Sequence, residues 1–350
     1  MLENLLLDYR DPLTGIIIIF LFIFLTSFLT YTFSKYKERQ SRGEYRKLLE
    51  RFELGTLKEE DYIHLYSTYN LPFDSILLLS SSFLHQGKYD KAISVYLTLL
   101  DYVKEPVKKE ELLEHLGSAY FKSGMLQRSR DIYLKILQFS PRNKVALHHL
   151  LLIFQNLKEF ERAKDVIESL EELDEDLIKE RIYLHTLQII NDSMVSYEKK
   201  SNQLLEQYLE DNRIERLVVN YLVKYNKELF WENIEKFNPM KIIDVLWYLD
   251  FEDIDWEKVN NIDTLKEIYN AKGYILDDAT ASKQFELNTL IAIKHSPVKS
   301  ELDLNFDFIC SKCKKNHPVY ESRCPHCQEP LSLNIEPRLG KATIDLSSLV

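Results

Sequence analysis

The sequence predicts an all-α protein, a solenoid of paired helices with one apolar span near its N-terminus and a small cysteine ribbon near its C-terminus. Three observations lead to this prediction. Eight glycines and ten prolines are few for 350 residues, which favours long helices over turn-rich β structure. Small and aromatic residues recur at a helical-repeat period over residues 73–177. All four cysteines fall in two C-x-x-C pairs.

The N-terminal span is residues 15–33, which read GIIIIFLFIFLTSFLTYTF without one charged side chain. A helix of this length rises about 28 Å and therefore crosses the ~30 Å hydrocarbon core of a bilayer. A cleaved signal peptide would instead carry basic residues before the apolar run and small residues at a cleavage site after it. Here acidic residues predominate before the run and basic residues after it: Glu3, Asp8 and Asp11 against Arg10, then Lys35, Lys37, Arg39, Arg42, Arg46 and Lys47 against Glu38 and Glu44.

The same order of charges predicts the orientation of the span. Cytoplasmic flanks of membrane spans are enriched in Lys and Arg, so residues 1–14 are expected to form a short extracytoplasmic segment. The chain after residue 34 then lies in the cytoplasm, which is reducing and keeps thiols free. Residues 34–72 are expected to be linker helices that join the span to the first repeat.

Residues 73–177 follow the tetratricopeptide (TPR) pattern, in which small and aromatic positions let two antiparallel helices approach closely. The unit 110–143 fits best, with Gly117 on its first helix, Gly124 at the turn and Pro141 at its end. The neighbouring units are in phase and supply the matching positions: Ile76, Ser80, Phe83, Gly87, Ala92 and Tyr96, then Leu147, Leu151, Phe154, Ala163 and Ile167. Three stacked units predict a solenoid whose concave face binds protein ligands.

Residues 178–300 keep apolar residues at helical spacing but lose the small residues that mark close packing. We interpret this region as degenerate TPR-like repeats. Residues 178–209 are interpreted as one degenerate repeat, and further helices are expected over 214–225, 228–237, 239–249, 263–271 and 281–295. Asn238-Pro239 and Gly273 indicate breaks between them.

The strongest chemical signal is Cys310-Ser-Lys-Cys313, a ten-residue gap, and Cys324-Pro-His-Cys327. Each pair brings two thiolates to one ion from a single turn, and the gap lets the second turn complete a tetrahedron. We predict a closed Cys₄ metal site in a ribbon over residues 305–335, followed by a tail over 336–350. Zn²⁺ is the expected ion and iron is the alternative, since both accept four thiolates.

Other uses of these cysteines fit the sequence less well. Two disulfides would need an oxidising compartment, which the predicted orientation opposes. A redox dithiol normally stands alone near a βαβ pattern, and no such pattern is present. His317 and His326 are interpreted as surface residues, because a full Cys₄ shell needs no further ligand.

The net charge and the absence of known catalytic motifs narrow the range of possible functions. The net charge of −10 gives no positive surface for nucleic acid, so no nucleic-acid partner is expected. The sequence has no H-E-x-x-H, Walker, G-x-G-x-x-G or G-x-S-x-G motif. We therefore expect a protein-binding scaffold rather than an enzyme. Whether the array forms a homo-oligomer stays open.

The order of these parts resembles the LapB family (lipopolysaccharide assembly protein B, also called YciM): one membrane helix, cytoplasmic TPR repeats and a rubredoxin-like Cys₄ ribbon. Similarity at the level of residues lies in the repeat positions and in the ribbon residues Cys310, Cys313, Cys324, Pro325 and Cys327. The ribbons of the family usually have Gly and an aromatic residue after the second cysteine, and Trp shortly before the third. This chain has Lys314-Lys315 and Ser322-Arg323 at those places.

The resemblance implies a bacterial inner-membrane adaptor without catalytic activity. Similar proteins work with the membrane protease FtsH to control the level of the deacetylase LpxC, and they help to organise lipopolysaccharide synthesis. By resemblance, the partners are a membrane protease and lipopolysaccharide-synthesis enzymes, bound through repeats against which the ribbon packs. Two other functions stay open from the sequence. They are electron transfer by iron in the ribbon, and a general envelope-assembly scaffold unrelated to lipopolysaccharide.

Overall fold

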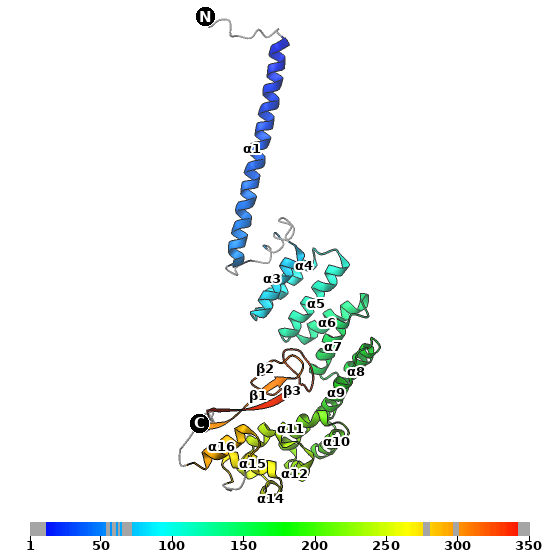
Figure 1. Cartoon of the computed structure of the whole chain (residues 1–350). Coiled ribbons are helices and arrows are strands. Elements are labelled where there is room, and N and C mark those ends of the chain that lie inside the picture. Colours follow the sequence, from blue (N-terminus) through cyan, green and yellow to red (C-terminus); the bar gives the residue numbers. More distant parts are fainter. Residues whose placement is uncertain are drawn as a thin grey trace. The chain divides into compact units, whose positions relative to one another are not determined.

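The computed structural model describes residues 12–53, 57, 61, 64, 72–275, 281–296 and 301–341 (Figure 1). The chain divides into two compact units, Met1–His149 and Leu150–Val350. Helices make up most of the described part of both units, and strands occur near the C-terminus of the second. Each unit is described by itself.

The N-terminal helix α1 spans Pro12–Glu53, 42 residues. Within it, Ile18–Lys37 is long and apolar enough to cross a membrane. Its large apolar side chains are exposed, as those of Phe20 and Phe24 illustrate at 70% and 72%. The hydroxyls of Thr26, Thr30 and Thr32 donate to carbonyls one turn earlier, which satisfies these polar groups within the helix.

Helix α1 continues past residue 33, where we expected the span to give way to separate linker helices. At ~1.5 Å per residue its 42 residues extend about 63 Å, roughly twice the thickness of a hydrocarbon core. The first part of the expected 34–72 linker is therefore an uninterrupted continuation of α1. The rest of that linker, apart from residues 57, 61, 64 and 72, lies outside the described residues, as does the expected extracytoplasmic segment up to residue 11.

The repeats of the first unit are pairs of antiparallel helices separated by tight turns. Their helices are α3 (Phe73–His85), α4 (Tyr89–Leu100), α5 (Pro106–Lys122), α6 (Leu126–Phe139) and the start of α7 (Lys144–Asn156). Gly87 and Gly124 end α3 and α5 with φ of 72° and 79°, a left-handed conformation that glycine adopts without steric cost. The glycines predicted for the turns thus have a conformational role.

Close helix contact in the best-fitting repeat depends on Gly117. A Cβ atom added at Gly117 would lie 2.8 Å from the ring of Tyr133, which is fully buried. The hydroxyl of Ser129 donates to the Gly117 carbonyl at 2.8 Å, so the two helices also share a hydrogen bond where their backbones approach. The small and aromatic positions of the pattern therefore meet as predicted.

The second unit continues with helices of 5 to 14 residues. They are α8 (Phe160–Glu171), α9 (Ile178–Asn191), α10 (Tyr197–Glu210), α11 (Glu215–Tyr225), α12 (Lys227–Glu232), α13 (Ile243–Trp247), α14 (Trp256–Asn261), α15 (Asp263–Lys272) and α16 (Phe285–Lys294). Four 3-10 turns are interspersed among them: η2 (Asn212–Ile214), η3 (Ile234–Lys236), η4 (Pro239–Lys241) and η5 (Phe251–Asp253).

Two helices that we predicted as continuous are interrupted in the structure, so these two predictions were wrong. The helix expected over 228–237 is α12 followed by η3, and the one expected over 239–249 is η4 followed by α13. Asn238 explains the second interruption, since its side chain accepts from the Met240 N–H and starts a new turn at the proline. Helix α14 was not expected, and the side chain of Asp255 caps its first turn.

Three antiparallel strands close the described chain: β1 (Leu302–Cys310), β2 (Asn316–His317) and β3 (Leu333–Lys341), in the order β2-β1-β3. Residues alternate along β1, and Leu304, Phe306 and Phe308 face inward. The strands extend beyond the expected ribbon range of 305–335. Residues 336–341, which we expected in the tail, pair with β1, and residues 342–350 lie outside the described residues.

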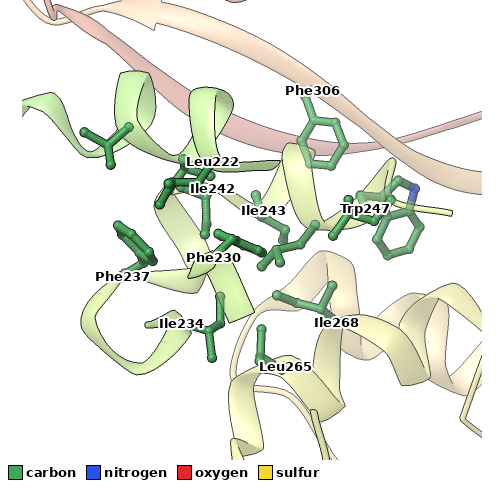
Figure 2. Packing of buried hydrophobic residues seen from close by; sticks show 14 of the residues in the cluster. Leu222, Phe230, Ile234, Phe237, Ile242, Ile243, Trp247, Leu265, Ile268 and Phe306 are labelled. Carbon is green, nitrogen blue, oxygen red and sulfur yellow. The ribbon is translucent and has the colours of Figure 1, made fainter. Parts of the chain in front are cut away.

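The ribbon shares its apolar core with the helices. Phe306 of β1 packs in one buried cluster with Trp247 of α13 and Ile268 of α15, as Figure 2 shows. The cluster also takes in the buried Cys310 and Cys324. The ribbon is therefore a part of the second unit, and its two buried cysteines belong to the same core as residues of α10 to α16.

Candidate metal centre

The two C-x-x-C segments form matching turns. The N–H of Lys314 donates to the Cys310 carbonyl at 3.0 Å, and that of Gln328 donates to the Cys324 carbonyl at 2.9 Å. Both donors adopt left-handed φ, 59° and 60°. Each first cysteine donates its own N–H back across the turn, Cys310 to Lys315 and Cys324 to Glu329. Two equivalent knuckles thus present their sulfurs from opposite sides.

The four sulfurs come together as the sequence predicts, all within 4.8 Å of one another. Across the two knuckles, the Sγ atoms of Cys310 and Cys327 are 3.6 Å apart, and those of Cys313 and Cys324 are 3.7 Å apart. A tetrahedron with Zn–S bonds of about 2.3 Å has sulfur separations of roughly 3.8 Å. These distances suit a four-thiolate metal site and are far longer than the ~2.05 Å of a disulfide.

The thiols differ in their affinity for protons. Burial alone would raise the pKa of Cys310, but the hydrogen bond between its sulfur and the Ser332 hydroxyl, together with hydrogen bonds from two backbone N–H groups, outweighs burial and lowers the pKa to about 6. Burial raises the pKa of Cys327 to about 12, and the neighbouring cysteines add to the rise. Burial likewise raises the pKa of Cys324. A cation is therefore needed before all four sulfurs can carry negative charge together.

The two histidines near the cluster differ in position. His326 is exposed, as expected. His317 was wrongly assigned to the surface, because it lies in β2, is half-buried, and places Nε2 3.4 Å from Cys324 Sγ. Its backbone position is fixed by pairing with Phe308 of β1.

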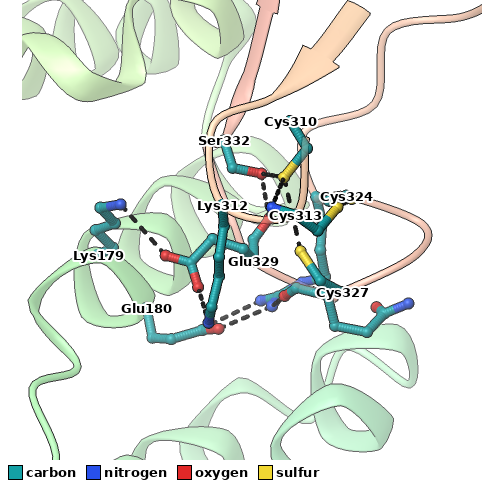
Figure 3. Close-up of polar contacts among 11 residues, drawn as sticks. Lys179, Glu180, Cys310, Lys312, Cys313, Cys324, Cys327, Glu329 and Ser332 are labelled. Atoms are coloured by element: carbon teal, nitrogen blue, oxygen red, sulfur yellow. Dashed lines mark hydrogen bonds and ion pairs between the residues drawn. The ribbon is translucent and has the colours of Figure 1, made fainter. Parts of the chain in front are cut away.

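The second knuckle docks on α9 through an ion pair (Figure 3). Arg323 Nη1 lies 2.8 Å from Glu180 Oε1, and Nη2 lies 2.7 Å from Oε2. The guanidinium also donates to Gln155 Oε1 at 2.7 Å and lies over the ring of Tyr183, 5.0 Å from its centroid. Both charged side chains are about nine-tenths buried. The geometry is the two-point fork in which Arg binds a carboxylate most strongly.

Two further contacts lie beside this pair. Glu329 accepts from Lys179 of α9 at 3.3 Å and from Lys312 of the first knuckle at 2.8 Å, as Figure 3 shows. The hydroxyls of Ser322 and Tyr183 are hydrogen-bonded at 2.9 Å. All ribbon residues of this interface except Lys312 belong to the segment that holds Cys324 and Cys327. The second pair of cysteines is thus positioned by the helices as well as by its own turn.

From the sequence, Ser322-Arg323 was only a departure from the family pattern. The contacts of these two residues with α9 were not predicted. Nothing in the sequence links Arg323 to Glu180, which lies 143 residues earlier. The strand β1 could have been found, since LDLNFDF alternates apolar and polar residues over 302–308. The contact of His317 with Cys324 had no such signal.

Fold and site together define a class of protein. It is a helical repeat protein with an N-terminal helix able to span a membrane and a C-terminal cluster of four cysteines able to hold a metal ion. The predicted fold class is confirmed in these respects.

Particular relatives are found by comparison with known proteins. The chain is 30% identical over 107 residues to lipopolysaccharide assembly protein B of Escherichia coli strain K12, and equally to the same protein of strains O157:H7 and O6:H1. The resemblance to LapB is confirmed over that stretch. The match covers 30% of this chain and spans only 27% of the length of those relatives. No protein-family profile matches the chain.

Among solved structures, the MamA RS-1 ArsTM double mutant matches at 17% identity and a TM-score of 0.33, covering 58% of this chain and 97% of that one. A tetratricopeptide repeat protein from Parabacteroides merdae ATCC 43184 has 14% identity and a TM-score of 0.35, covering 73% of this chain and all of its own.

Proposed function

We propose that this chain is an adaptor anchored in the bacterial inner membrane, which binds proteins of lipopolysaccharide assembly through its helical repeats. The observation that carries the proposal is the 107-residue similarity to lipopolysaccharide assembly protein B. Residues 15–33 lie within the membrane, and the repeats and ribbon lie in the cytoplasm. The order of the charges that flank the span supports this orientation.

In this proposal Cys310, Cys313, Cys324 and Cys327 hold one structural metal ion, with Zn²⁺ expected. The sulfur separations support a closed shell of four thiolates, and such a shell leaves no open position for a substrate. A bound ion contributes folding free energy and ties the two knuckles together. Since Arg323 and Glu329 belong to the second knuckle, holding that knuckle in shape also keeps the ribbon docked on α9.

More specifically, the adaptor works with a membrane protease of the FtsH type to control the level of the LpxC deacetylase, as the family resemblance implies. A single membrane helix would confine the repeats to the plane in which such a protease lies. Confinement raises the effective concentration of the two proteins without any additional contact. The chain itself supplies binding surfaces rather than catalytic groups.

Crosslinking in native membranes tests the adaptor. The tagged full-length protein is compared with a Cys310→Ser/Cys313→Ser double variant and with Ser311→Ala, an exposed residue of the same turn. Capture of lipopolysaccharide-synthesis proteins and a membrane protease is expected for the wild type and for the control. The double variant should stay in the membrane and lose these partners. Equal capture by all three proteins would contradict the proposal.

Depletion of the protein separates the lipopolysaccharide role from a general envelope scaffold. Lipopolysaccharide and deacetylase levels should both change if the adaptor controls their balance. Unchanged levels, together with capture of unrelated envelope proteins, would favour the general scaffold. The metal is identified on native protein, where zinc leaves the protein colourless and iron in four thiolates gives a visible absorption band and a reversible reduction wave.

A further inference from the structure

The buried cysteine of each knuckle has a side-chain partner from elsewhere in the ribbon. Ser332 Oγ lies 3.4 Å from Cys310 Sγ, and His317 Nε2 lies 3.4 Å from Cys324 Sγ. Both of these cysteines are fully buried, whereas Cys313 and Cys327 are half-buried. Side-chain polar groups therefore lie against the two sulfurs that solvent does not reach.

The position of His317 is set by the fold. Strand β2 consists of Asn316 and His317, which pair with Ile309 and Phe308 of β1. This pairing holds the backbone of His317 next to the strand that ends at Cys310. The sheet therefore holds the backbone from which the half-buried imidazole reaches Cys324, and this favours a preorganised contact.

Four thiolates around a divalent cation carry a net charge of −2 in a largely buried site. Hydrogen-bond donors to the sulfurs disperse this charge, and outer-shell partners of metal ligands typically change metal affinity 10- to 100-fold. Backbone N–H groups supply part of this donation, as those of His326 and Cys327 do for Cys324. An imidazole Nε2–H would add a side-chain donor and would cover one side of the same sulfur.

We propose that His317 is a positioning residue of the metal centre. It donates an Nε2–H···Sγ hydrogen bond to the Cys324 thiolate, slows release of the bound ion, and does not itself ligate it. This inference rests on the metal binding proposed above. It predicts a Cys₄ shell with one imidazole in hydrogen-bond contact with it.

The test uses the full-length protein in detergent, loaded with Zn²⁺ or with Co²⁺ as a spectroscopic probe. His317→Phe keeps a planar ring without a donor, and His317→Gln keeps an N–H donor. His326→Phe is the matched control, since His326 is exposed on the same ribbon. Transfer of Zn²⁺ to a chromophoric chelator gives the release rate. The sulfur-to-cobalt charge-transfer band reports the electron density at the thiolates.

We expect His317→Phe to release Zn²⁺ at least about 10-fold faster, in line with other outer-shell partners, and to shift the cobalt charge-transfer band to longer wavelength. His317→Gln should restore most of both properties, and His326→Phe should match the wild type. The band is the decisive readout, because a merely structural role would leave it unmoved. If His317→Phe folds poorly, the wild-type cobalt spectrum still tests the inference, because it distinguishes four thiolate ligands from three thiolates and one nitrogen.

One result would overturn the inference alone: one metal ion per chain with identical release and spectra in all variants. A wild-type cobalt spectrum of three thiolates and one nitrogen would make His317 a ligand and would overturn the proposed shell of four thiolates as well. A wild-type protein that takes up no metal would overturn the proposed metal binding as well. The two failures are therefore distinguishable by metal stoichiometry.

Discussion

Arg323 of the cysteine ribbon and Glu180 of α9, 143 residues apart in sequence, form a two-point ion pair in which each guanidinium Nη binds one carboxylate oxygen. Their side chains are only 12% and 13% exposed. A pair this deep in the protein has lost most of its hydration, so its two members depend on each other.

Removal of one member should therefore cost more than removal of both. We expect Arg323→Met to destabilise the second unit by about 3–5 kcal/mol, because Glu180 is left as a buried, uncompensated charge. The double variant Arg323→Met/Glu180→Leu should recover much of that loss. Denaturant unfolding of the full chain measures both values. A double variant that loses the sum of the two single losses would show that the pair is not coupled.

The conformation of the knuckles leads to a second prediction. Lys314 and Gln328 have left-handed φ of 59° and 60°, which costs a residue with a Cβ atom about 1 kcal/mol or more relative to glycine. Lys314→Gly and Gln328→Gly should each stabilise the metal-loaded ribbon by about 1 kcal/mol. Lys315→Gly is the control and should give no gain, since Lys315 has no positive φ. Thermal unfolding of the loaded protein is the measurement.

The family resemblance led us to expect a glycine after the second cysteine, and this geometry is the one that glycine favours. The turn needs a left-handed residue there, and this chain meets the need with Lys314. Lys314 differs from that glycine in residue type, whereas its backbone conformation is the one that glycine favours. The departure therefore does not disturb the placement of the four sulfurs.

The close contact in the first unit gives a third prediction. Gly117→Ala would place a methyl group 2.8 Å from ring atoms of Tyr133, so one helix must shift. We expect a loss of about 1–3 kcal/mol, typical of an overpacked core. Gly117→Ala/Tyr133→Leu should regain part of it, because the ring is gone. As a control, Gly43→Ala in α1 has no atom within 4 Å and should be tolerated.

Local pattern was sufficient to predict the apolar helix, the repeats and the cysteine cluster, because each depends on residues close in sequence. Gly117, Gly124 and the two C-x-x-C pairs are of this kind. The docking of the ribbon depends on pairs such as Arg323 with Glu180, and His317 depends on the pairing of β2 with β1. Such contacts are set by tertiary packing, which the spacing of residues in one sequence does not encode.

The protonation of the thiols gives the last prediction. With a pKa of about 6, Cys310 is mostly a thiolate at pH 7, whereas the raised pKa values of Cys324 and Cys327 keep both protonated in the metal-free protein. Zn²⁺ ligation requires four thiolates, so binding at pH 7 should release at least the two protons of Cys324 and Cys327. Apparent affinity should accordingly rise with pH between 7 and 9. Calorimetry in buffers of different ionisation enthalpy counts these protons, and binding without proton release would mean that these two thiols do not ligate the ion.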